Sequence, residues 1–328
     1  MTENKHYHDD NKEIFETGAE VAKRSLGHVA VPETYRDLTP RINNDILVEM
    51  GDINHKITRY DKYMTSESRD RLATDFLDIY FETQEKLDKG REITDQERLD
   101  EIATTNIFSR AFKHIFSGID ANKREHEVHE LGQAILGKID DRTGSIHQHS
   151  SNEEWFYGDE IEKIPEVVAF QMLMKGVRFE IAATDCLEEL VEKGALAAVR
   201  SASLVEDVEK GFDVLVTDKK GQDFKIDIKS HNSYERILGK PDFIDEIDTG
   251  LLMKRGHDGD TVLAIDVDTH GFNGHMQTNK ETGETYYRKH DTHKFELTNK
   301  QDFLDALRIG IGAMRVSTET SQRHLKAA

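Results

Sequence analysis

The spacing of hydrophobic residues changes near the middle of the chain. In the first 140 residues, apolar side chains recur every three or four positions, which is the spacing of amphipathic helices that share a core. Beyond residue 195, shorter runs either alternate between apolar and polar residues or are rich in β-branched residues, as strands are. We therefore predict an α/β protein, with a mainly helical N-terminal part followed by a mixed sheet flanked by helices.

The helical part is expected to contain five helices. A break is expected at Gly51, Thr94 and Glu97 form a capping box, and Gly137 is expected to end the last helix. The expected ranges are residues 12–26, 41–60, 66–89, 94–118 and 123–136. Residues 140–152 are polar and contain Gly144, which is typical of a linker. We accordingly predict two domains, residues 1–150 and 151–328.

A hairpin stands at the centre of the second domain. Residues 212–216 and 223–229 have strand character, and residues 218–221 supply a polar turn with a glycine. The period of two places Asp227 and Lys229 on one face of the second strand and its apolar residues on the other. Asp213 interrupts an apolar strand, where a carboxylate is costly without a partner. Pairing of the two strands could bring Asp213 beside Asp227.

The rest of the second domain is expected to complete a layered α/β fold. Pro165 suits the first turn of a buried helix, and residues 176–194 are expected to form a second helix with Glu180 near its start. A strand should follow before the hairpin. Residues 261–267 are typical of a buried central strand, and residues around 285–287 of an antiparallel excursion. Thr298 opens a capping box that precedes the C-terminal helix.

Composition restricts the setting of the protein. The single cysteine, Cys186, excludes an intrachain disulfide and favours a reducing, cytoplasmic environment, where it is expected to be buried. No stretch approaches eighteen apolar residues, so we expect no membrane partner. The net charge of −20 is unusual for a nucleic-acid-binding protein. It is compatible either with adaptation to salt or with a small, local contact to nucleic acid.

Several enzyme classes are excluded by missing motifs. The sequence has no glycine-rich phosphate loop and no GxSxG elbow. His126 and His129 stand three apart, whereas the metalloprotease motif needs four, so zinc is not expected there.

The order of acidic residues in the second half resembles the PD-(D/E)xK nuclease superfamily, which has the restriction-endonuclease-like fold. The resemblance covers roughly residues 165–267 and rests on a helix with Glu180, an intervening strand, Gly-Phe-Asp ending at Asp213, a turn, and Asp-Ile-Lys from Asp227 to Lys229. The proline that gives the superfamily its name is absent, because Gly211 and Phe212 precede Asp213.

The resemblance implies Mg²⁺-dependent hydrolysis of DNA phosphodiester bonds, with Mn²⁺ as a possible substitute. The implied metal ligands are Asp213, Asp227, the backbone carbonyl of Ile228 and Glu180, because hard oxygen donors suit Mg²⁺. Lys229 is the implied catalytic cation, which would position or deprotonate the attacking water. Four residues at or after the end of the hairpin are candidate substrate contacts: Ser230, His231, Tyr234 and Arg236.

Three further expectations concern partners and alternatives. Because every candidate catalytic residue follows the linker, the N-terminal domain is expected to target or regulate. A homodimer would present two sites to the two strands of a duplex. The competing interpretations are an inactive relative that binds nucleic acid or protein, and an exonuclease or structure-specific resolvase.

Overall fold

The computed structural model describes thirteen parts of the chain: residues 44–57, 63–88, 108–143, 165–202, 206–230, 234, 237, 243–248, 250–256, 259–269, 274–278, 285–289 and 295–327. They divide into a helical unit and a sheet unit. The helical unit includes residues 11–178 and 270–295, and the sheet unit includes residues 179–269 and 296–328.

The helical unit is built around α3 (Asn44–Lys56), α4 (Ser66–Asp88), a helix over residues 108–118, and α6 (Arg124–Thr143), which follows the short turn η4 (Ala121–Lys123). Thr65 caps α4, because its Oγ1 accepts a hydrogen bond from the backbone N of Ser68 at 3.1 Å. Aromatic rings fill the core. The rings of Phe76 and Phe170 meet edge to face with centroids 5.5 Å apart. The ring centroids of Phe108 and Phe112 are 4.8 Å apart.

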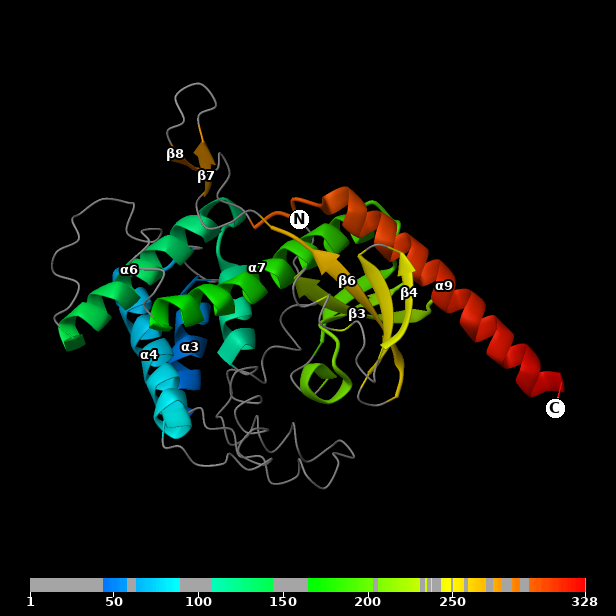
Figure 1. Cartoon of the computed structure of the whole chain (residues 1–328), viewed down its shortest axis with the longest axis horizontal. Coiled ribbons are helices and arrows are strands. Elements are labelled where there is room, and N and C mark those ends of the chain that lie inside the picture. The colour runs from blue at the N-terminus through cyan, green and yellow to red at the C-terminus, as the bar shows by residue number, and fades with distance from the viewer. Residues whose placement is uncertain are drawn as a thin grey trace. The chain divides into compact units, whose positions relative to one another are not determined.

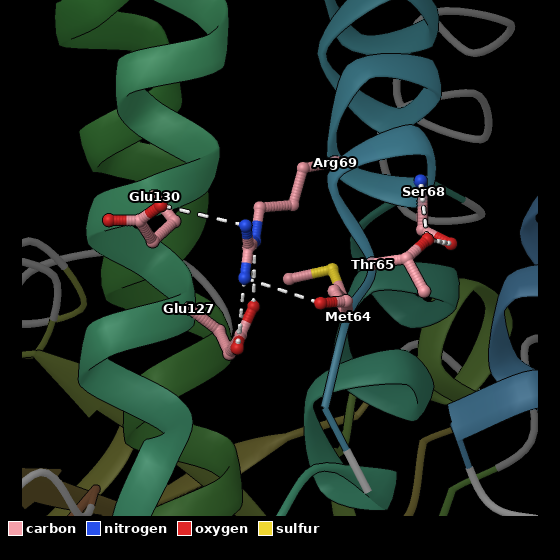
Figure 2. Close-up of polar contacts among 6 residues, drawn as sticks. All are labelled: Met64, Thr65, Ser68, Arg69, Glu127 and Glu130. Carbon is pink, nitrogen blue, oxygen red and sulfur yellow. Dashed lines mark hydrogen bonds and ion pairs between the residues drawn. The ribbon is translucent and has the colours of Figure 1, made fainter. Parts of the chain in front are cut away.

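A buried arginine–glutamate pair joins α4 to α6 (Figure 2). Arg69 on α4 donates from Nε to Glu127 Oε2 at 3.0 Å and from Nη2 to Glu127 Oε1 at 3.3 Å. Nη2 also reaches the carbonyl of Met64 at 3.2 Å, and Nη1 lies 3.5 Å from Glu130. Because the side chain of Glu127 is only 2% exposed, its charge depends on this bidentate contact.

One long helix, α7 (Pro165–Glu192), contributes to both units. Its first half supplies Phe170 and Arg178 to the helical unit, and Arg178 pairs with Glu125 at 2.9 Å. Its second half supplies Ile181 and Leu187, which are buried, to the sheet unit. Gly194, at φ 67°, ends the helix in the left-handed conformation that glycine adopts easily.

A mixed six-stranded sheet forms the second unit (Figure 1). Its strand order is β1-β2-β3-β6-β5-β4, and only the β3–β6 pair among these strands is parallel. The strands are β1 (Ala198–Ser201), β2 (Val214–Thr217), β3 (Asp223–Ser230), β4 (Phe243–Asp248), β5 (Leu251–Arg255) and β6 (Thr261–Val267). A single π-helical turn, η7 (Glu206–Lys210), lies between β1 and β2.

Helix α9 (Lys300–Ala327) packs against β4, β5 and β6 (Figure 1). Close approach is possible because a glycine, Gly310, faces Leu263 and Leu251 of the sheet. On β3, Phe224, Ile226 and Ile228 are buried on one face, while Asp227 and Lys229 lie on the other, as predicted.

The predicted α/β class is confirmed, and most predicted elements in the described residues are present. The predicted hairpin strands correspond to β2 and β3, the intervening strand to β1, and the buried central strand to β6. The predicted excursion is an antiparallel pair in the helical unit, β7 (Gly274–Thr278) and β8 (Thr285–Lys289). Cys186 is buried as expected, and burial raises the pKa of its thiol.

The break predicted at Gly51, the helix end predicted at Gly137 and the helix start predicted at Gly176 are wrong. Helix α3 runs through Gly51, α6 continues beyond Gly137 to Thr143, and Gly176 lies inside α7. Glu180 therefore stands in the middle of one long helix rather than near the start of a second one. Packing against the core outweighs the helix cost of a glycine, which is about 1 kcal/mol relative to alanine.

The predicted capping box at Thr298 is also wrong. Helix α9 begins at Lys300, and Thr298 Oγ1 instead donates to Asp268 Oδ2 at 2.9 Å. The β4–β5 hairpin was not predicted from the sequence. The expected helix at residues 12–26, the start of the 94–118 helix and most of the expected linker lie outside the described residues. Of the helices described, none is both long and apolar enough to cross a bilayer.

Candidate active site

The antiparallel pairing of β2 with β3 brings two carboxyls together. Val214 pairs with Ile226, and Asp213 immediately precedes Val214. The amide of Asp213 donates to the carbonyl of Ile226 at 2.9 Å and its Oδ2 accepts from the backbone N of Ile228, so Asp213 lies beside the segment of β3 that contains Asp227. The predicted proximity of Asp213 and Asp227 is thus present in the fold.

Asp213 is a buried carboxyl with a raised pKa. Its side chain is 8% exposed, and Oδ2 accepts a hydrogen bond from the backbone N of Ile228 at 2.6 Å. Burial is the main cause of the raised pKa, and the charges of Asp227, Glu180 and Asp207 add to it. The ammonium of Lys229 opposes the shift without cancelling it.

Asp227 is the ionised partner. It is 2% exposed, and two ammonium groups contact it: Lys229 Nζ at Oδ1, and Lys254 Nζ at Oδ2 at a distance of 2.5 Å. Burial alone would raise the pKa of Asp227, but Lys229, Lys254 and a hydrogen bond from Asp213 lower it. The two carboxyls therefore have opposite pKa shifts and are joined by a hydrogen bond from Asp213 to Asp227.

Lys229 remains a cation in this arrangement. Burial would lower its pKa, but the carboxylates of Asp227 and Asp213 raise it. Its side chain is 29% exposed, so part of the ammonium stays accessible from solvent. Lys229 can thus interact with a bound anion while it contacts Asp227.

Glu180 is connected electrostatically to this pair. It is half-buried on the second half of α7, and its charge raises the pKa of Asp213. Asp207, in the π-helical turn, acts on both Asp213 and Lys229 in the same way and was not predicted from the sequence. Nothing in the sequence singles out Asp207 as a site residue, because it lies in an ordinary acidic stretch.

The candidate substrate contacts are only partly described. Ser230 is half-buried at the end of β3. Tyr234 is buried against Ile237, Leu252 and Ala264, and its hydroxyl lies 3.5 Å from both Glu246 Oε1 and the carbonyl of Asp248. Burial and the charge of Glu246 raise the pKa of Tyr234 to about 12. His231 and Arg236 lie outside the described residues.

Sequence reasoning missed Lys254. It lies on β5, two strands away from Asp227, and no local pattern indicates that these strands lie near each other. The available signal was a lysine directly after three apolar residues of β5 (Leu251–Arg255), because a charged residue is rarely buried unless it is paired.

The donor set suits a hard divalent cation. Two adjacent carboxylates with a third nearby are the ligands that Mg²⁺ prefers. In the described residues, no group of three or more His, Cys, Asp or Glu side chains is already arranged for a metal ion. Both oxygens of Asp227 face ammonium groups, so a cation would have to displace at least one of them.

Comparison of the chain with family models, with curated proteins and with solved structures found no match.

Proposed function

We propose that this protein is a Mg²⁺-dependent endonuclease that hydrolyses DNA phosphodiester bonds. The observation that carries the proposal is the direct contact of Asp213 with Asp227 beside the accessible ammonium of Lys229. Two carboxyls are rarely buried against each other in an ordinary ion pair, because the cost of removing them from water is high. Such a pair is more typical of a site that binds a cation or transfers a proton.

The environment of each residue determines the role that we assign to it. Asp213 and Asp227 would hold Mg²⁺, with Glu180 and the carbonyl of Ile228 as further oxygen donors. When bound, the ion would polarise the scissile phosphate and lower the pKa of water for attack. Asp227 needs no deprotonation for this role, because Lys229 and Lys254 already keep it ionised.

Lys229 is assigned charge stabilisation rather than proton abstraction. Its raised pKa keeps it protonated, so it cannot accept a proton from water at neutral pH. A partly exposed ammonium next to the carboxylates can instead orient the phosphodiester and offset the charge that develops on its oxygens.

The order of elements supports the restriction-endonuclease-like fold as part of this proposal. Glu180 on α7 is followed by β1, then by Asp213 immediately before β2, a turn, and Asp227 and Lys229 on β3. This is the order on which the resemblance to the PD-(D/E)xK superfamily rests. A mixed sheet with helices is compatible with it.

The acidic surface limits how DNA would be held. With a net charge of −20, long-range attraction of a polyanion is weak, so contact would be confined to the site and helped by the metal.

A dimer with a two-fold axis would place one site on each strand of the DNA duplex, and light scattering of the protein with and without DNA would test this arrangement.

Cleavage of closed circular DNA tests the activity. Wild-type protein should nick or linearise the circle with Mg²⁺ and not with EDTA. The variants Asp213→Asn and Asp227→Asn should lose at least about 100-fold in rate, because each removes a carboxyl group that would hold the metal ion. A closed circle has no ends, so cleavage also excludes a strict exonuclease.

One observation favours a non-catalytic binding module. Both oxygens of Asp227 contact an ammonium group, Lys229 at Oδ1 and Lys254 at Oδ2, which is also how a purely structural ion pair would look. In that case Lys229→Met should destabilise the fold by about 3–5 kcal/mol, and Mg²⁺ should not change any melting temperature. If the site is catalytic, Mg²⁺ should raise the melting temperature of the wild type through binding.

A further inference from the structure

We propose that Lys254 is a built-in counter-cation that occupies Asp227 in the absence of metal and competes with the divalent cation for it. Lys254 would thus set the affinity of the site for metal. This inference rests on the proposed function, because it takes Asp227 to be a metal ligand.

The sheet geometry allows Lys254 to reach Asp227 from two strands away. Asp227 pairs with Ala264 on β6, and Ala264 pairs with Leu252 on β5, so these three residues lie in one row across the sheet. Lys254 is two residues further along β5 and points to the same face. Strands are about 4.8 Å apart, so the distance from β3 to β5 is about 10 Å. Ala264, which lies between Asp227 and β5 in this row, has a small side chain.

The contact is a buried one. The side chain of Lys254 is 11% exposed and that of Asp227 is 2% exposed, with Nζ and Oδ2 separated by 2.5 Å. A buried carboxylate must be neutralised, and here the neutralising charge comes from the chain itself. In the Lys225–Asp260 pair, by contrast, the carboxylate is 67% exposed.

Competition follows from charge and space at the two carboxylate oxygens. Lys229 contacts Oδ1 and Lys254 contacts Oδ2, so a metal ion at either oxygen meets an ammonium group. Lys229 interacts with both Asp227 and Asp213, whereas the contact described for Lys254 is with Asp227. Withdrawal of Lys254 therefore breaks fewer favourable interactions. Its flexible stem lets the ammonium move away while the strand stays in place.

The proposal predicts that removing Lys254 tightens metal binding. Mn²⁺ binding to the full-length chain would be measured by calorimetry, without DNA. Lys254→Met should bind Mn²⁺ about 10–100-fold more tightly than wild type, which is the range over which neighbouring groups tune metal sites. Lys254→Arg keeps the charge and should not reproduce this gain.

A matched control separates competition from a general change in charge. Lys225 lies on the same face of β3 but pairs with Asp260 at 2.7 Å. Lys225→Met removes one positive charge nearby and should leave the Mn²⁺ affinity within about three-fold of wild type, because its exposed pair is screened by solvent. An equal gain for Lys225→Met and Lys254→Met would overturn the proposal.

A measurement on the wild-type protein tests the displacement of Lys254 even if the Lys254→Met variant does not fold. Lysines are acetylated with an amine-reactive reagent and mapped by mass spectrometry, with and without Mn²⁺. Displacement predicts that Mn²⁺ raises modification of Lys254 and leaves Lys225 unchanged. If Mn²⁺ binds but Lys254 stays equally protected, Lys254 is not the displaced group.

The outcomes distinguish the two proposals. If the wild type binds Mn²⁺, Asp227→Asn does not, and Lys254→Met has unchanged affinity, then only the role of Lys254 is wrong. If neither wild type nor Lys254→Met binds Mn²⁺ at Asp227, both the metal site and the role of Lys254 are wrong. Tighter binding by Lys254→Met that is lost in the double variant with Asp227→Asn supports both.

Discussion

At the scale of single residues, the site is defined by two carboxyls in contact with opposite pKa shifts. Asp213 has burial and neighbouring acids around it, whereas Asp227 has two lysines. Their contact was predictable, because alternation along β3 and pairing with β2 already place Asp213 and Asp227 together. The contact with Lys254 was not, because it depends on which strands lie next to β3.

The raised pKa of Asp213 predicts how stability depends on pH. A carboxyl whose folded-state pKa is raised contributes stability below its ordinary pKa of 3.8, and this contribution is lost as the pH rises through the folded-state value. Asp213→Asn mimics the protonated form, so it should resist this loss. In EDTA, its free energy of unfolding should exceed that of wild type by an amount that grows as the pH rises above the ordinary pKa of 3.8.

Urea unfolding at several pH values measures this difference. Asp260→Asn is a suitable control, because Asp260 is exposed and lies immediately before β6 of the same sheet. Its curve should run parallel to that of wild type. Parallel curves for Asp213→Asn as well would mean that Asp213 is ionised in the folded protein, contrary to the described environment.

At the scale of elements, the Arg69–Glu127 contact should stabilise the packing of α4 on α6 (Figure 2). Glu127→Ala leaves a mostly buried guanidinium with weaker partners, so we expect a loss of about 3 kcal/mol in the free energy of unfolding. Glu67→Ala removes an exposed glutamate that pairs with Arg71 on α4 and should cost no more than about 0.5 kcal/mol. Chemical denaturation of both variants decides whether burial makes the difference; equal losses would contradict this account.

Two glycines of α9 should respond in opposite ways to alanine. A Cβ at Gly312 meets nothing within 4 Å, so Gly312→Ala should gain about 0.5–1 kcal/mol from helix propensity. A Cβ at Gly310 would lie 2.8 Å from Leu263 Cδ1, and overpacking of this kind costs about 1–3 kcal/mol. Gly310→Ala should therefore be the less stable of the two in thermal unfolding. Equal stability would mean that α9 does not pack closely on β5 and β6.

Element boundaries were harder to predict from the sequence than element types. The hydrophobic stripes of α4 and α9 and the alternation along β3 identify these elements correctly. The helix breaks and boundaries predicted at Gly51, Gly137 and Gly176 are wrong, because the low helix propensity of glycine is outweighed by tertiary packing. The β4–β5 hairpin was missed since the exposed, acidic β4 lacks the β-branched run that made β6 recognisable.

At the scale of the whole molecule, the division between compact units falls within α7, between Arg178 and Phe179. The predicted domain boundary near residue 150 stays a prediction, because residues 144–164 are not described. Sequence reasoning could not have found a division inside a continuous helix, since nothing in local spacing marks it. Glu180 follows this division by two residues, on the same helix as Arg178 of the helical unit.

The most direct test of the central claim is Mg²⁺-dependent cleavage of closed circular DNA by the full-length chain, with Asp227→Asn and Asp260→Asn compared in one experiment. Both variants remove one carboxylate charge from the sheet unit, but only Asp227 contacts Asp213 and Lys229. The account predicts cleavage by wild type and Asp260→Asn, and none by Asp227→Asn. Cleavage by Asp227→Asn at the wild-type rate would contradict the assignment of this site.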